Sequence, residues 1–221
     1  TAIDRRDLVG MTHFLRASLY YHLIELYGPV VIMPEDPIVV DNDISEISFP
    51  RSTYDECVEY ICSDLEKAYA LLDPKRTTTE FSKPTKYAAA FLLSRVRLTQ
   101  ASPWFNGNSF YSSWKTEEGA NFINQTHRPE LWSKAAAAAK RMIDSGQFDL
   151  HTVPADETTP AFPAAPQDLY PNGVGGIDPF HSYADMFNGE ALAVKNPEII
   201  FPAAGFNDQN TKTAFPLFMN G

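Results

Sequence analysis

Residues 14–33, FLRASLYYHLIELYGPVVIM, constrain the fold most, because they begin as a long helix and end abruptly. Apolar residues recur here every three or four positions, which places them on one side of a helix: Leu8, Met11, Leu15, Leu19, Leu23 and Tyr27. That face is widened by Phe14, Tyr20, Tyr21 and Ile24, so we expect burial on more than one side. Gly28 can close a helix and Pro29 cannot continue one. The pattern predicts a helix over about residues 5–27 and an apolar extended exit.

Three further long helices follow from start and stop signals. Thr53 and Glu56 form a capping box that opens a second helix, which ends before Pro74. A third helix is expected from about residue 85 to residue 100. A fourth is expected over residues 129–145, with Gly146 as its stop. Its predicted packing face is Trp132, Ala135, Ala136, Ala139, Met142 and Ile143. A short helix near residues 182–188 and a brief strand at residues 199–201 are also expected.

The charge balance argues against a nucleic-acid partner. The formal net charge is -10, whereas phosphate binding needs clustered Lys and Arg. The five histidines are scattered, which predicts no metal site, and no cofactor motif is present. Cys57 and Cys62 do not have a redox or zinc spacing, so both are interpreted as unpaired buried residues. No apolar run reaches the length of a membrane span.

The aromatic loop, residues 102–128, is the strongest local candidate for a binding site. Loops this long in a compact domain are usually functional or disordered, and aromatic content argues against disorder. Sugar rings stack on Trp and Tyr, and Asn amides bind hydroxyls. The candidate ligand-binding residues are Trp104, Asn106, Asn108, Tyr111 and Trp114. The alternative is that these side chains anchor the loop onto the helices. Residues 124–126, Asn-Gln-Thr, match an N-glycosylation acceptor triplet, and we assign them no other role.

Composition changes after residue 150. The last 71 residues hold nine of the 17 prolines and six of the 11 glycines. We expect one piece of a single domain over residues 1–221, with a helical scaffold at 1–150. Residues 151–221 would form a loop-rich segment of the ligand-binding face. The chain opens close to a helix and stops in an apolar stretch, as expected for part of a longer protein.

Six blocks in a fixed order make the chain resemble the SusD/RagB family of outer-membrane nutrient-binding lipoproteins. The first is the Tyr20-Tyr21 to Gly28 helix, and the second is the cap at residues 51–56. The third and fourth are the Thr85-Lys86-x-Ala-Ala helix and the Ala-Ser-Pro-x-Phe-Asn turn at residues 101–106. The last two are residues 132–150 and the block that runs from Tyr183 to residue 201.

The resemblance implies a mainly α fold of tetratricopeptide-like helical hairpins (an α-α superhelix), with long irregular loops and little β structure. It implies a surface-exposed outer-membrane protein, lipid-anchored through a segment outside this chain. The implied partners are an oligosaccharide or polysaccharide and a SusC-like TonB-dependent transporter. The implied function is glycan binding for nutrient uptake, without catalysis. A peptide-binding or protein-binding member, or a transporter lid with little ligand affinity, remains an alternative.

Overall fold

The computed structural model describes residues 4–37, 49–160, 175–188, 190–191 and 195–202. It separates into two compact units, which are described one at a time. The first comprises residues 1–76 and 83–144, and the second comprises residues 77–82 and 145–221. Most of residues 34–50 lies outside the described residues, as does much of the segment 151–221. No described helix is both long enough and apolar enough to cross a membrane.

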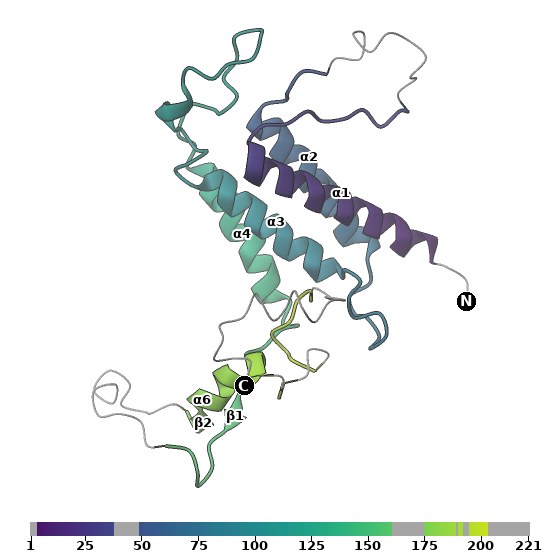
Figure 1. The fold of residues 1–221 in the computed structure, drawn as a ribbon, viewed down its shortest axis with the longest axis vertical. Coiled ribbons are helices and arrows are strands. Elements are labelled where there is room, and N and C mark those ends of the chain that lie inside the picture. Colours follow the sequence, from purple (N-terminus) through teal and green to yellow (C-terminus); the bar gives the residue numbers. More distant parts are fainter. Residues whose placement is uncertain (1–3, 38–48, 161–174, 189, 192–194, 203–221) are drawn as a thin grey trace. The chain divides into compact units, whose positions relative to one another are not determined.

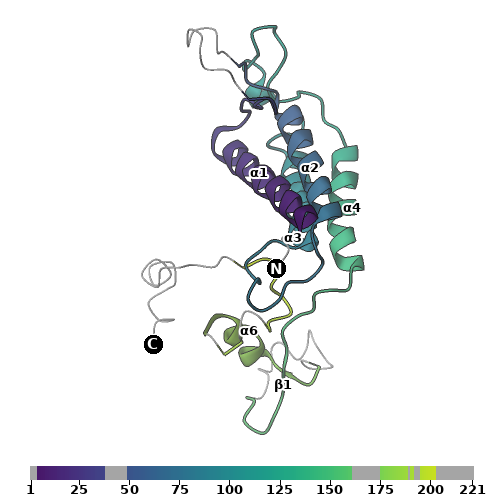
Figure 2. The same cartoon turned by 90° about the vertical axis from the view of Figure 1, so that its right-hand side faces the viewer.

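The first unit is built from helices that neighbour one another in chain order (Figures 1 and 2). They are α1 (Arg5–Tyr27), α2 (Tyr54–Leu71), α3 (Lys86–Ala101) and α4 (Glu130–Asp144). A short 3-10 helix, η2 (Ser109–Tyr111), lies in the connection between α3 and α4. Helix α1 packs on α2, α2 on α3, and α3 on α4. The predicted long helices are therefore confirmed, with boundaries within two residues of those expected.

Local capping explains why the helices begin where they do. The Asp4 carboxylate accepts the backbone N–H groups of Arg6 and Asp7 at the start of α1. At α2 the predicted capping box is present: the Glu56 carboxylate accepts the Thr53 N–H at 2.7 Å, and the Thr53 hydroxyl accepts the Glu56 N–H at 3.3 Å. Thr85 caps α3 through the Ala88 N–H. Because these contacts join residues close in sequence, the helix starts can be predicted from the sequence alone.

Helix α1 buries the opposite side from the one predicted by its leucine spacing. Phe14, Ala17, Tyr21 and Ile24 are at most 5% exposed and join the core of α2 and α3. The leucine side is open among the described residues, with Leu8, Leu15, Leu19, Leu23, Leu26 and Tyr27 each at least 40% exposed. The expected burial of Phe14, Tyr21 and Ile24 is confirmed, whereas the burial predicted for the leucine side is wrong. Helix α1 is apolar on two sides, and periodicity alone cannot choose between them.

Two buried carboxylates fix the helices of this unit. Asp64 on α2 is 1% exposed and receives two hydrogen bonds from Arg16 of α1, at 2.6 and 2.9 Å. Asp7 receives two from Arg76, each at 2.8 Å, and Arg76 also donates to the Pro84 carbonyl. The Arg76 hydrogen bonds lower the pKa of Asp7. Both pairs are bidentate, so they set orientation as well as distance.

Helix α4 also turns a face to its neighbours that differs from the expected one. Its buried residues are Leu131, Ala135 and Ala138, whereas Trp132 is 44% and Ile143 is 78% exposed. The run of alanines at residues 135–139 gives no side a larger apolar side chain. The two large apolar residues at its ends were therefore misleading guides to the packing side.

The second unit contains a small antiparallel pair, β1 (Val153–Pro154) and β2 (Ile177–Asp178), followed by α6 (Pro179–Asn188). Asp178 caps α6 through the His181 N–H at 2.9 Å, which lowers the pKa of Asp178. The predicted short helix is thus present but begins earlier. The predicted strand at residues 199–201 is wrong. Asn196 instead accepts the N–H groups of Glu198 and Ile199, and these contacts make a turn.

Candidate functional site

The aromatic loop joins α3 to α4 and is closed by one buried amide. The Asn106 side chain is 5% exposed and bridges the two limbs of the loop. Its oxygen accepts the Arg128 N–H at 2.7 Å, and its NH₂ group donates to the Arg128 carbonyl at 3.0 Å. A further hydrogen bond joins the Gly107 N–H to the Asn124 carbonyl at 3.3 Å. The Asn106 amide therefore holds the loop in shape.

The next candidate amide, Asn108, organises the tip of the loop. Its oxygen accepts the Phe110 N–H at 3.0 Å and so caps η2. Its NH₂ group donates to the Trp104 carbonyl at 3.2 Å. Asn108 thereby links the backbone of Trp104 to the turn that carries Phe110 and Tyr111. These hydrogen bonds give the tip of the loop a defined conformation.

Tyr111 and Trp114 lie partly buried against the core of the helices. Their ring centroids are 6.2 Å apart, and the Trp114 ring lies 5.1 Å from that of Phe122. Trp114 also reaches the end of α1, where a Cβ built on Gly28 would lie 3.2 Å from its indole ring. The Gly28 φ of 68° further favours glycine. The end of α1 therefore accommodates the Trp114 ring.

Two rings of the loop face solvent in the described structure. Trp104 is 65% exposed and Phe110 is 79% exposed. Aromatic side chains this exposed provide flat apolar surface that a ligand can cover. Phe110 was not among the predicted site residues, because nothing in the sequence distinguishes it from an anchoring ring. It lies two residues after the Asn108 cap, within η2.

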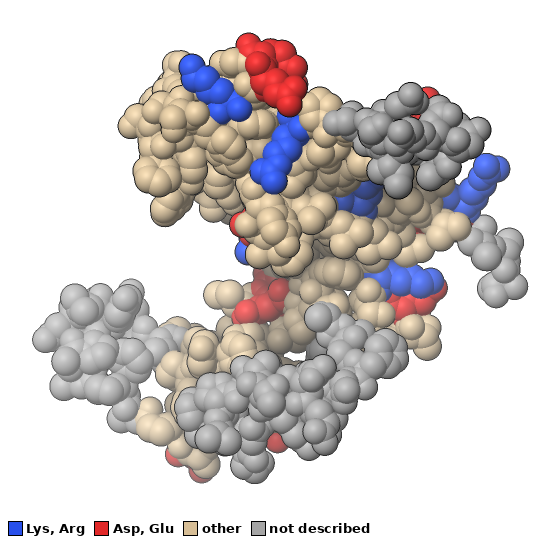
Figure 3. All heavy atoms as spheres, turned by 45° about the horizontal axis from the view of Figure 1, so that its top comes forward, with Lys and Arg blue, Asp and Glu red and all other residues tan. Residues whose placement is uncertain are grey.

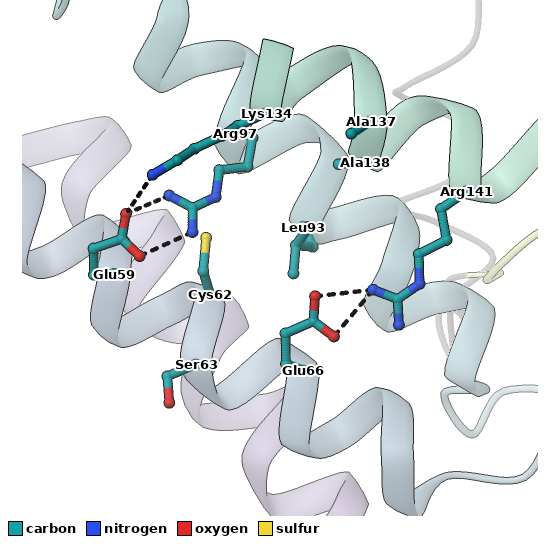
Figure 4. Close-up of a pocket in the computed structure, with 10 residues that line it drawn as sticks. All are labelled: Glu59, Cys62, Ser63, Glu66, Leu93, Arg97, Lys134, Ala137, Ala138 and Arg141. Carbon is teal, nitrogen blue, oxygen red and sulfur yellow. Dashed lines mark hydrogen bonds and ion pairs between the residues drawn. The ribbon is translucent and has the colours of Figure 1, made fainter. Parts of the chain in front are cut away.

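A groove of about 550 Å³ lies between α2 and α4, with Leu93 of α3 among its lining residues. Figure 4 shows that charged side chains from α2 face those from α3 and α4 across it. Glu59 pairs with Arg97, and Glu66 accepts two hydrogen bonds from Arg141 at 2.9 and 3.0 Å. The Arg141 guanidinium also lies 3.6 Å from the centre of the Tyr69 ring. The Arg141 contacts link α4 to α2, and the Glu59–Arg97 pair links α3 to α2. Each cation that lines the groove pairs with Glu59 or Glu66.

The groove contains the thiol of Cys62, which is 2% exposed. Burial raises the pKa of this thiol to about 12, so it remains protonated at neutral pH. Cys57 is also buried and free, as expected for both cysteines. Within the described ranges, no group of three or more His, Cys, Asp or Glu side chains could hold a metal ion.

Charge is dispersed over the surface that Figure 3 turns toward the viewer. Most of the side chains there are uncharged, and the Lys, Arg, Asp and Glu side chains are interspersed. A single-sign patch would attract oppositely charged partners, and this face shows none among the described residues.

The helices and their aromatic loop define a class of protein: a scaffold of α-helical hairpins with a long aromatic loop between α3 and α4. The SusD-like family model, described as "Starch-binding associating with outer membrane", matches residues 1–98. A SusD-like protein of Bacteroides ovatus is 25% identical over 101 residues, which cover 46% of this chain and 17% of that protein.

Solved structures share the fold over nearly the whole chain. The structure of BT4246 has a TM-score of 0.70 and 22% identity, covering 94% of this chain and 36% of that one. A SusD-like protein from Bacteroides fragilis has a TM-score of 0.58 and 21% identity, covering 94% and 29%. The chain thus spans about a third of the length of these structures. At such identity the likeness shows the fold.

Residues 1–98 therefore match the SusD-like family model, and nearly the whole chain shares the fold of the SusD-like structures. The predicted mainly α fold of tetratricopeptide-like hairpins is confirmed. The description of that family model names starch binding and association with the outer membrane. No residue of the aromatic loop lies within the matched range, so the ligand-binding role predicted for that loop stays a prediction.

Proposed function

We propose that this protein binds oligosaccharides or polysaccharides at the cell surface, as the lipid-anchored, non-catalytic subunit of a TonB-dependent uptake system with a SusC-like transporter. The observation that carries the proposal is the match of residues 1–98 to a starch-binding, outer-membrane-associated family. The residue types of the aromatic loop add chemical support, because exposed aromatic rings beside neutral amides suit glycans.

Within the loop we propose different roles for the five predicted residues. Trp104 stacks on a sugar ring, since its side chain is 65% exposed. Tyr111 and Trp114 contribute ring edges from positions partly buried against the core. Asn106 and Asn108 act through the backbone contacts that hold the loop in the binding conformation.

Calorimetry on the full-length protein with neutral oligosaccharides tests the function. Trp104→Ala is expected to weaken binding about tenfold, since stacking and area burial on one aromatic ring contribute about 1–2 kcal/mol. The melting temperature should stay within about 1 °C of wild type because the ring is exposed. Trp132→Ala is the matched control, because Trp132 is also exposed but lies on α4 outside the loop. Equal affinity of the two variants for the oligosaccharide would show that Trp104 does not contact the ligand.

A peptide-binding function is the second candidate, and the net charge of -10 favours it for basic peptides. Salt distinguishes the two functions. Binding of a basic peptide should weaken markedly between 50 mM and 500 mM NaCl, whereas stacking on a neutral glycan should be nearly constant. Binding of peptides without any binding of glycans would overturn the proposed function.

A further inference from the structure

A small polar cavity lies between the first turn of α2 and the returning limb of the aromatic loop. Its volume is about 300 Å³. Its described lining residues are Thr53, Asp55, Asn121, Phe122, Asn124, Gln125 and Thr126. All of these except Phe122 have side chains that form hydrogen bonds. The cavity therefore offers a dense set of polar groups in a confined space.

The walls of the cavity are fixed by backbone contacts. The Tyr54 N–H donates to the Phe122 carbonyl at 2.9 Å and joins α2 to the loop. The Asn124 side-chain oxygen accepts the Thr126 N–H at 2.9 Å. On the α2 side, Thr53 is held by its capping box. A ligand would enter a largely preformed site, which lowers the entropic cost of binding.

The charge of the cavity selects against ions. Asp55 is its one charged lining residue among those described, and its carboxylate accepts hydrogen bonds from Arg128 at 2.8 Å and from Gln100 at 3.0 Å. A bound cation would have to compete with Arg128 for this carboxylate. A bound anion would meet a carboxylate and no Lys, Arg or His among the described lining residues. The remaining class is a neutral ligand that both donates and accepts hydrogen bonds.

One polar atom at this cavity lacks a partner. The side-chain oxygen of Asn121 is shielded from solvent and accepts no hydrogen bond within the described structure. Rotating the amide toward the cavity therefore breaks no hydrogen bond of this oxygen. A ligand hydroxyl could then satisfy an acceptor that is costly to leave unpaired.

We propose that this cavity is a subsite for one neutral sugar ring of a bound glycan. A cavity of about 300 Å³ is at the small end of ligand sites, so it suits a single ring rather than a chain. Sugar hydroxyls match its amides and hydroxyls, and Phe122 supplies an apolar contact. The subsite rests on the proposed glycan-binding function and adds residues that the predicted site does not contain.

The position of the cavity supports this reading. Asn124 in its wall accepts the Gly107 N–H, and Gly107 follows the exposed Trp104 by three residues. The cavity and the exposed rings thus belong to one loop whose limbs lie side by side. A glycan that stacks on the rings could place a neighbouring ring in the cavity.

Two glutamines provide a matched test. Gln125 donates its NH₂ group to the carbonyl two residues earlier, at 2.8 Å, and Gln147 does the same at 3.1 Å. Only Gln125 is among the cavity residues. Gln125→Ala and Gln147→Ala therefore lose the same local contact, while only the first loses a cavity amide. Calorimetry on the full-length protein should use maltoheptaose, cellohexaose, xylohexaose and mannohexaose.

For whichever of these oligosaccharides binds wild type most tightly, Gln125→Ala should raise Kd about five- to tenfold, and Asn121→Ala should do likewise. Gln147→Ala should leave Kd unchanged. A crystal structure of wild type with that oligosaccharide should show a sugar ring in the cavity. This measurement tests the subsite even if a variant fails to fold.

The two proposals can fail separately. If wild type binds none of the four oligosaccharides, the proposed function and the subsite both fail for neutral glycans. If wild type binds one of them but Gln125→Ala and Asn121→Ala bind it equally well, only the subsite is overturned. Water alone in the cavity of a glycan complex would also overturn it.

Discussion

Replacing the buried carboxylate Asp64 by an amide tests how strongly α1 is fixed to α2. Asp64 accepts two hydrogen bonds from Arg16, at 2.6 and 2.9 Å, and its contact with His13 Nδ1 is 2.9 Å. Asp64→Asn preserves size but leaves the Arg16 guanidinium facing an amide with one acceptor fewer. Removing one partner of a buried pair costs roughly 3–5 kcal/mol. Arg16 is 31% exposed and can regain water, so we expect about 3 kcal/mol.

Asp144→Asn is the matched control. Asp144 pairs with Lys140 on α4, and both side chains are more than half exposed. An exposed pair one helical turn apart contributes only about 0.3–0.5 kcal/mol. Urea unfolding of the two variants should show a large shift of the midpoint for Asp64→Asn and a small one for Asp144→Asn, with unchanged slopes. Equal losses of stability in the two variants would refute the argument from burial.

The pH dependence provides a second check on Asp64. Burial alone would raise the pKa of Asp64, but hydrogen bonds from Arg16 and His13 outweigh it and lower the pKa. A carboxylate with a lowered pKa stabilises the fold above its unfolded pKa of about 3.9. That stabilisation is lost as the pH falls through the folded pKa. The stability gap between wild type and Asp64→Asn should therefore be widest near neutral pH and narrow in acid below about pH 4.

Two further substitutions test the loop and its support. Gly28→Ala should lower the free energy of unfolding by about 2 kcal/mol or more, because Gly28 has φ 68° and a Cβ would lie 3.2 Å from Trp114. The melting temperature of the variant measures this loss. Gly146→Ala, at φ 57° with nothing within 4 Å, should cost less, and the reverse order would contradict the steric argument. Asn106→Ala should lower the free energy of unfolding by about 2 kcal/mol and expose the loop to protease, because the Arg128 N–H loses its acceptor. An unchanged melting temperature and an unchanged rate of cleavage would show that other contacts hold the loop.

Helix positions were predictable because their signals are local. Thr53 with Glu56 and the pair Gly28-Pro29 lie within a few residues of the helix ends that they determine. The packing sides were harder to predict. Helix α1 is apolar on two sides, and α4 presents alanines in every direction. In both helices the choice of side depends on neighbours distant in sequence, and no periodicity contains that information.

The candidate site was predictable as a region but not as a set of roles. Aromatic density identified the loop, yet the structure divides its rings between exposed Trp104 and partly buried Trp114. The role of Asn106 depends on Arg128, which lies 22 residues later. The polar cavity was missed because its walls come from α2 and the loop together, while residues 124–126 alone match only a glycosylation-type triplet.

The end of α1 and the conformation of the loop are physically linked through one contact. Gly28 ends the helix with a positive φ, and its missing side chain makes room for the Trp114 ring. Trp114 in turn packs on Phe122, whose carbonyl accepts the Tyr54 N–H at the start of α2. A substitution at Trp114 would therefore loosen the loop before it removed any ligand contact. Loss of binding in such a variant could not separate structure from recognition, so Trp104 is the residue whose substitution reports on the ligand.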